Sequence, residues 1–125
     1  MIKGIEHIGL AANNPAKLVK WYQDNLSMEL AFKENDECFF IKAPCGSIIE
    51  VYKSEKNSHD KDNNMATGWR HLAIEVEDFD IEHQKLLNNG TQQVGNLISN
   101  DVKKLVLFKD CEGNLFHLIQ RPKSQ

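Results

Sequence analysis

Three of the five histidines stand in apolar surroundings, where an imidazole needs a partner. His7, His71 and His117 each lie inside an apolar stretch, whereas His59 and His83 lie among polar residues and are interpreted as surface side chains. A side chain of this kind buried without a partner is costly, and a bound metal ion would remove that cost. A single such histidine is usually a hydrogen-bonded core residue, so the metal hypothesis depends on several occurring at matched positions.

Glu50 adds a carboxylate to the same hypothesis. It lies within the apolar run of residues 48–53, where a glutamate taken alone would more often point outward. Three imidazoles and one carboxylate form a nitrogen and oxygen donor set that suits divalent Zn, Ni, Fe, Mn or Co. Alternate residues of a strand share a face, so Glu50 would share its face with Tyr52, and His71 with Trp69. We therefore predict one divalent metal ion bound by His7, Glu50, His71 and His117.

The first half of the chain predicts a strand, a helix and three further strands. Asn14 followed by Pro15 is typical of a helix start, because asparagine caps the first turn and proline lacks an N–H that this turn does not use. Apolar residues then recur at three- and four-residue spacing up to Leu26, which gives the helix one buried face. The expected elements are a strand over 2–11, a helix over 15–26, and strands over 28–32, 38–41 and 47–53.

The same order recurs after a polar connection. Residues 54–67 have almost nothing to bury and are interpreted as an exposed segment. In the second half Asp78 or Asp80 can cap a helix, and Gly90 can supply the left-handed residue that ends it. The expected elements are a strand over 69–76, the helix, and strands over 91–99, 102–109 and 115–121.

Two short alignments between the halves indicate an internal repeat. The segment EHIGLA matches RHLAIE, which superposes His7 on His71, and CGSIIE matches EGNLFH, which superposes Glu50 on His117. Structural copies should hold equivalent side chains at nearly constant spacing. The four candidate ligands therefore occupy equivalent positions, in the middle of the first and last strand of each half.

Length and composition restrict the remaining possibilities. The chain has 125 residues and a formal net charge of -3, which disfavours nucleic acid and acidic membrane surfaces as partners. A chain of this length can bury a core without disulfide bonds or a structural metal ion, so a bound metal would have a functional role. No apolar run approaches the ~18 residues that span a bilayer. The start lacks the pattern of a signal peptide, and we expect a cytoplasmic protein with reduced cysteines.

The sequence resembles the vicinal oxygen chelate superfamily, which includes glyoxalase I, bleomycin-resistance proteins, fosfomycin-resistance transferases, methylmalonyl-CoA epimerase and extradiol dioxygenases. The resemblance lies in IEHIGLAANNPAKLVKWYQDNL, SIIEVYK, GWRHLAIEVEDFD and FKDCEGNLFHLIQ. It implies an α+β fold of two tandem βαβββ modules that form a cupped mixed sheet, as in glyoxalases. We expect a single domain over 1–125, with modules over about 1–54 and 68–122 and a linker over about 55–67. Relatives of this size commonly form homodimers.

The resemblance also implies a reaction class. The four family ligands fall on His7, Glu50, His71 and His117, and the last is a departure, because many glyoxalase I relatives have a carboxylate there that also acts as base. Glu50 is then the candidate catalytic base of a lyase or isomerase resembling lactoylglutathione lyase. Its substrate would be a small oxygenated molecule chelated through neighbouring oxygens. Arg121 is a candidate partner for a substrate carboxylate.

Two other functions stay open. One is a metal-independent protein of the bleomycin-resistance type that sequesters an antibiotic or planar metabolite, with Trp69, Tyr52 and Phe40 stacking on the ligand. The other is a dioxygenase that binds iron through His7, His71 and one further ligand. Metal analysis separates the first from the metal-dependent functions.

Overall fold

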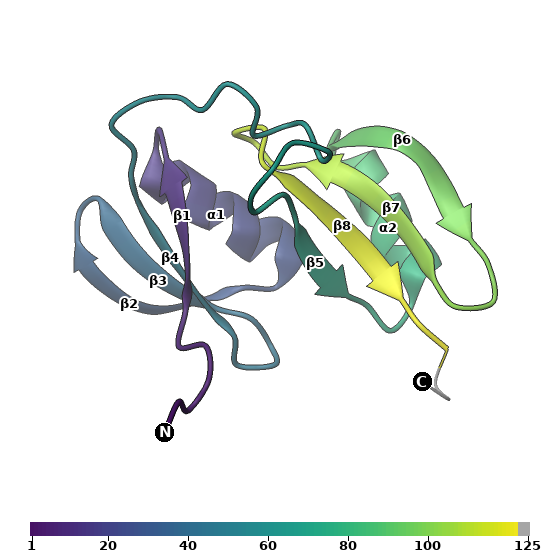
Figure 1. Ribbon diagram of the computed structural model, residues 1–125, viewed down its shortest axis with the longest axis horizontal. Helices are drawn as coiled ribbons and strands as arrows, with labels where there is room; N and C mark the ends of the chain where they lie inside the picture. Colours follow the sequence, from purple (N-terminus) through teal and green to yellow (C-terminus); the bar gives the residue numbers. More distant parts are fainter. Residues whose placement is uncertain (123–125) are drawn as a thin grey trace. The chain divides into compact units, whose positions relative to one another are not determined.

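Two compact units make up the chain. The structure, a computed structural model, describes residues 1–122, and the first unit comprises residues 1–57 while the second begins at Ser58. Each unit has one four-stranded mixed sheet and one helix, in the order strand, helix, three strands (Figure 1). The predicted α+β class and the two βαβββ modules are thereby confirmed. Neither helix of the described residues is long and apolar enough to span a membrane.

The first unit places helix α1 on one face of its sheet. The strands lie in the order β1-β4-β3-β2, with β1 parallel to β4 and the other pairs antiparallel. Leu18 and Tyr22 of α1 are fully buried together with Ile41 and Val51 of the sheet, which leaves the alternate residues of β3 and β4 on the opposite face. The elements are β1 (Ile8–Ala12), α1 (Pro15–Leu26), β2 (Glu29–Asn35), β3 (Cys38–Lys42) and β4 (Ile48–Lys53).

Helix α1 has the bounds that its local signals predict. Asn14 is the N-cap, and its side chain accepts a hydrogen bond from the Lys17 backbone N–H at 3.2 Å. Pro15 occupies the first turn, and Ser27 ends the helix with a left-handed φ of 56°. Capping of this kind satisfies amide groups that the first turn cannot pair internally.

The second unit repeats this arrangement. Its strands lie in the order β5-β8-β7-β6, with β5 parallel to β8 and the other pairs antiparallel. Phe79 and Leu86 of α2 are buried together with Phe108 and Phe116, so the helix covers one face of this sheet as well. The elements are β5 (Leu72–Glu75), α2 (Phe79–Asn88), β6 (Gln92–Ser99), β7 (Lys104–Lys109) and β8 (Leu115–Gln120).

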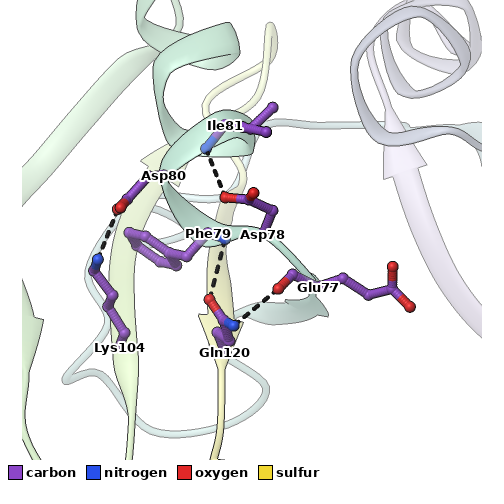
Figure 2. Close-up of polar contacts among 7 residues, drawn as sticks. All are labelled: Glu77, Asp78, Phe79, Asp80, Ile81, Lys104 and Gln120. Atoms are coloured by element: carbon purple, nitrogen blue, oxygen red, sulfur yellow. Dashed lines mark hydrogen bonds and ion pairs between the residues drawn. The ribbon is translucent and has the colours of Figure 1, made fainter.

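Helix α2 is held at its start by a side chain from the end of β8. Gln120 Oε1 accepts from the Phe79 backbone N–H at 3.1 Å, and Gln120 Nε2 donates to the Glu77 carbonyl at 2.8 Å (Figure 2). Of the two predicted caps, Asp78 is the one used, accepting from the Ile81 N–H at 3.3 Å. Asp80 instead forms an ion pair with Lys104 at 2.6 Å. The last strand of the unit is therefore tied to its helix.

The first strand of each unit begins later than predicted. His7 and His71 directly precede β1 and β5, so the expectation that they lie in mid-strand was wrong. The cause is the partner strand: Ile8 pairs with Ile49, one residue after β4 begins. Leu72 pairs with Phe116 in the same way, one residue after β8 begins. Residues before His7 and His71 would lie opposite the turns that precede β4 and β8, so the first strands cannot extend as far back as predicted.

Candidate metal centre

In the first unit His7 and Glu50 lie side by side. His7 Nε2 is 3.5 Å from Glu50 Oε1, and the two side chains are 37% and 26% exposed. Glu50 sits in the middle of β4, an inner strand, opposite Gly9 of β1 and Phe40 of β3. The sheet thus fixes Glu50 on both sides, and the chain entering β1 brings His7 to it.

The other ring nitrogen of His7 is already engaged. Glu6 Oε1 lies within hydrogen-bond distance of His7 Nδ1, a contact that sequence reasoning missed because adjacent strand residues usually point to opposite faces. Glu6 and, with smaller effect, Glu50 raise the pKa of His7 above its usual value. With Nδ1 engaged, Nε2 is the nitrogen that could bind a metal.

In the second unit His71 and His117 lie side by side in the same way. The two imidazole centroids are 4.4 Å apart. His117 lies in the middle of the inner strand β8, opposite Leu107 of β7 and Ala73 of β5. Burial, with a smaller effect from neighbouring cationic side chains, lowers the pKa of His117 to about 4. His117 is therefore a neutral imidazole at pH 7, the form that binds metals.

His71 also has its Nδ1 engaged, here by the connecting segment. The Nδ1 atom lies 2.7 Å from Asn64 Oδ1. Asn64 belongs to residues that the sequence indicated only as a polar connection. Composition gave no signal for this contact, because a single asparagine among polar residues is unremarkable.

Two pairs of predicted ligands are thus each brought together within their own unit. His7 and Glu50 offer nitrogen and oxygen, and His71 and His117 offer two imidazoles. Imidazole and carboxylate suit Zn²⁺, Fe²⁺, Ni²⁺, Co²⁺ and Mn²⁺. The donor chemistry of the residues present fits the divalent ion that the sequence predicts.

Cys38 is a neighbour of Glu50 that sequence reasoning did not include. Its buried thiol donates a hydrogen bond to Glu50 Oε2 at 3.5 Å. Ligand atoms of Glu34, Cys38 and Glu50 lie within 4.8 Å of one another. Burial and the nearby carboxylates raise the pKa of Cys38 to about 11, so the thiol is protonated and can donate. The contact requires the register between β3 and β4, which the sequence does not supply.

Two of the predicted substrate-binding residues share the sheet face of Glu50. Phe40 is opposite Glu50 in the β3–β4 ladder, and its ring meets His7 edge-on with centroids 5.7 Å apart. Tyr52 lies two residues beyond Glu50 and covers Gly9, where an added Cβ would be 3.3 Å from the Tyr52 ring. Phe32, which was not among the predicted site residues, stacks on Phe40 with the ring centroids 4.4 Å apart.

The other two predicted substrate-binding residues lie in the second unit. Trp69 is 96% exposed and precedes His71 by two residues. Arg121 is exposed just beyond β8, where its Nη1 donates to the Val102 carbonyl at 3.5 Å. Arg121 is among the cations that lower the pKa of His117.

One of the two histidines interpreted as surface residues is instead packed. His83 Nε2 lies 2.9 Å from Gln93 Oε1, and its ring contacts Phe79 and Phe108 edge-on. The interpretation was wrong for His83 because the polar neighbours in sequence lie on another face of α2. His59 is exposed, as expected.

The pair of βαβββ units is the architecture of glyoxalase-type proteins. The chain belongs to the Glyoxalase/Bleomycin resistance protein/Dioxygenase superfamily, whose sequence profile matches residues 4–118. The resemblance inferred from the motifs is thereby confirmed.

Curated relatives are similar over nearly the whole chain. An uncharacterized protein of Shewanella frigidimarina is 26% identical over 96% of this chain and 95% of its own. Metallothiol transferase FosB of Staphylococcus haemolyticus is also 26% identical, over 94% of this chain and 84% of its own.

Solved structures share the fold. A glyoxalase family protein from Bacillus cereus has a TM-score of 0.82 at 16% identity, covering 97% of this chain and 95% of its own. The fosfomycin resistance protein FosX from Listeria monocytogenes, complexed with Mn(II) and sulfate, has a TM-score of 0.76 at 17% identity, covering 99% and 94%.

Proposed function

We propose that this chain is a metalloenzyme of the superfamily that binds one divalent ion through His7, Glu50, His71 and His117 and converts a small oxygenated substrate. The observation that carries the proposal is the pairing of these donors within each unit, His7 with Glu50 and His71 with His117. In both histidines that precede a strand, the Nδ1 atom faces an oxygen acceptor, and Nε2 remains for the metal. The family relatives named above support a metal, because one carries it in its name and another was crystallised with Mn(II).

The leading reaction is a proton transfer of the lyase or isomerase type. The bound ion would lower the pKa of a C–H bond beside the oxygen atoms that it chelates. Glu50 is the one carboxylate of the proposed donor set, so it is the group that takes the proton from carbon and returns it. Its Oε1 lies toward His7, which leaves Oε2, beside the Cys38 thiol, to carry the proton.

The aromatic residues on the Glu50 face would hold the apolar part of the substrate. Phe32 and Phe40 form a stacked pair beside His7, and Tyr52 covers the neighbouring backbone at Gly9. Apolar surroundings of this kind strengthen the interactions of a carboxylate with a developing charge. Trp69 and Arg121 complete the proposed substrate contacts, with the guanidinium pairing a substrate carboxylate.

A second candidate reaction is the transfer of a thiol to the substrate. It is favoured by the likeness to metallothiol transferases, which extends over 94% of this chain. Both reactions would use the same donor set. Only the thiol transfer needs a second substrate, so one metal-loaded preparation tests both.

Metal content is the first test. We expect elemental analysis after titration with Zn²⁺, Mn²⁺ or Ni²⁺ to give one ion per chain, and the variants H7A and H117A to lower affinity sharply. The loaded protein is then assayed with the hemithioacetal of methylglyoxal and with fosfomycin plus a thiol. A wild-type chain that binds no divalent ion would contradict the proposal and would favour sequestration of a planar ligand by the aromatic residues.

We also propose that the protein forms a homodimer, as the resemblance implies. Light scattering on the metal-free and loaded protein measures the mass in solution. A monomer under both conditions would contradict this part of the proposal.

A further inference from the structure

The segment that joins the two sheets carries a residue to which the proposed reaction assigns no role. Asn64 lies in the polar connection, and its side-chain oxygen is 2.7 Å from Nδ1 of His71. We propose that Asn64 is a positioning residue that selects the tautomer and fixes the orientation of His71, so that Nε2 is the nitrogen available to a metal. This inference rests on the metal centre proposed above.

The chemistry of the two groups determines the tautomer. An amide oxygen only accepts hydrogen bonds, so at 2.7 Å the proton must be on Nδ1 of His71. A neutral imidazole carries one N–H, and Nε2 then has a free lone pair. A histidine that binds a metal generally donates its other N–H to an oxygen in this way, which fixes the ring and raises the basicity of the ligand nitrogen.

Asn64 is itself held in place by contacts on the preceding residues. Nη1 of Arg70 donates to the carbonyls of Asp60 and Asn63, each at 3.0 Å. Asp62 pairs with Lys109 of β7 at 3.3 Å. Arg70 directly precedes His71, so the residue that anchors the segment is the chain neighbour of the residue that Asn64 contacts.

The turn around Asn64 is closed by its neighbours. Asn63 Oδ1 accepts from the Met65 N–H at 3.0 Å, and the Ala66 N–H donates to the Asn63 carbonyl at 3.2 Å. Asn64 is half-buried inside this turn. A backbone held on both sides keeps the Asn64 side chain close to the ring that it contacts.

The first unit satisfies the same requirement differently. Glu6, the residue next to His7, engages Nδ1 there, whereas Asn64 precedes His71 by seven residues. An amide acceptor adds no charge to the centre, while a carboxylate would add one. The variant Asn64→Asp therefore keeps the acceptor oxygen, adds a negative charge and removes the amide N–H donors.

The test uses the full-length chain and two independent measurements. Long-range ¹⁵N–¹H correlation of the histidine rings in the metal-free protein at pH 8 reports the His71 tautomer, and H71Q identifies its signals. Competition with a chromophoric chelator measures Zn²⁺ affinity. We expect the wild type to show the Nδ1–H tautomer. Asn64→Ala should shift the ring toward the Nε2–H form and lower Zn²⁺ affinity by about 10- to 100-fold.

Matched variants separate positioning from damage to the fold. Asn64→Asp should restore the tautomer and most of the affinity, and Asn64→Gln, which displaces the oxygen by one methylene group, should not. His59→Ala removes an exposed histidine from the same segment and should change neither measurement. An Asn64→Ala protein with wild-type tautomer and affinity would overturn the inference. If the wild type binds no Zn²⁺, the metal proposal fails, whereas the tautomer measurement still decides whether Asn64 positions the ring.

Discussion

Cys38 and Glu50 lie on neighbouring antiparallel strands, with the thiol sulfur 3.5 Å from the carboxylate oxygen Oε2. The protonated thiol is a weak donor, and it contacts the oxygen of Glu50 that is not the one nearest His7. The two carboxylate oxygens of Glu50 therefore have different partners, His7 for Oε1 and Cys38 for Oε2.

Replacing the thiol should test this orientation. Cys38→Ser keeps a donor and should preserve Zn²⁺ affinity, while Cys38→Ala should lower it by roughly tenfold, because contacts that orient a ligand typically contribute that much or more. Calorimetric titration measures both. A sulfur-to-metal charge-transfer band in the Co²⁺-loaded wild type, absent in Cys38→Ser, would instead make Cys38 a ligand and refute the orienting role.

Replacing Glu50 by glutamine should remove turnover. The amide keeps the shape but cannot take a proton, so we expect kcat to fall by about 10²- to 10⁴-fold, the usual contribution of a general base. Steady-state kinetics at saturating metal give the value. Glu75→Gln is the matched control, because Glu75 is an exposed strand glutamate of the second unit. Full activity of metal-loaded Glu50→Gln would exclude Glu50 as the base.

The metal-free protein should lose stability in mild acid through His117. Its pKa is about 4 in the folded chain and near 6.5 in the unfolded chain, so between these values only the unfolded chain takes up the proton. This contribution is complete above pH 6.5 and is lost as the pH falls toward 4. Because the ring is partly exposed, we expect the free energy of unfolding to fall by only about 1 kcal/mol through His117.

Urea denaturation of the wild type and of His117→Leu between pH 4 and 7.5 measures this difference. The free energy of unfolding of the variant should depend less steeply on pH. His7 contributes with the opposite sign in both proteins, because its raised pKa favours the folded chain at low pH and this effect is lost as the pH rises. The same pH dependence of the free energy of unfolding in the two proteins would refute the role of His117.

Gln120→Ala should destabilise the second unit. The change removes two hydrogen bonds at the start of α2 and leaves the Phe79 N–H without its acceptor, which should cost about 1–2 kcal/mol. Urea denaturation followed by circular dichroism gives the free energy of unfolding. Asp80→Ala breaks the ion pair with Lys104 and removes an acidic residue from the first turn of α2, and should cost about 0.5 kcal/mol. A Gln120→Ala loss no larger than that of Asp80→Ala would argue against the cap.

The start of helix α1 was predictable from local signals, whereas the starts of the first strands were not. The signals for α1, Asn14 and Pro15, are local and act through the backbone of the same turn. The start of β1 depends on where β4 leaves its turn, some forty positions along the chain, and periodicity contains no such information. The two helices and eight strands of the described residues were nevertheless expected in the right order, because apolar periodicity and turn residues mark them.

Sequence reasoning proposed the donors of the candidate site but not the residues that contact them. The internal repeat selected His7, Glu50, His71 and His117, and each unit brings its pair together. Contacts from Glu6 and Asn64 had no sequence signal, because they depend on how the chain approaches each sheet. The repeat preserves strand positions, while the residues around them differ between the halves.

Each pair joins one donor on an inner strand with one at the entrance of an edge strand. Glu50 and His117 lie in strands hydrogen-bonded on both sides, while His7 and His71 precede β1 and β5, which are bonded to a single neighbour. Amide hydrogens around residues 7 and 71 should therefore exchange with solvent faster than those around 50 and 117.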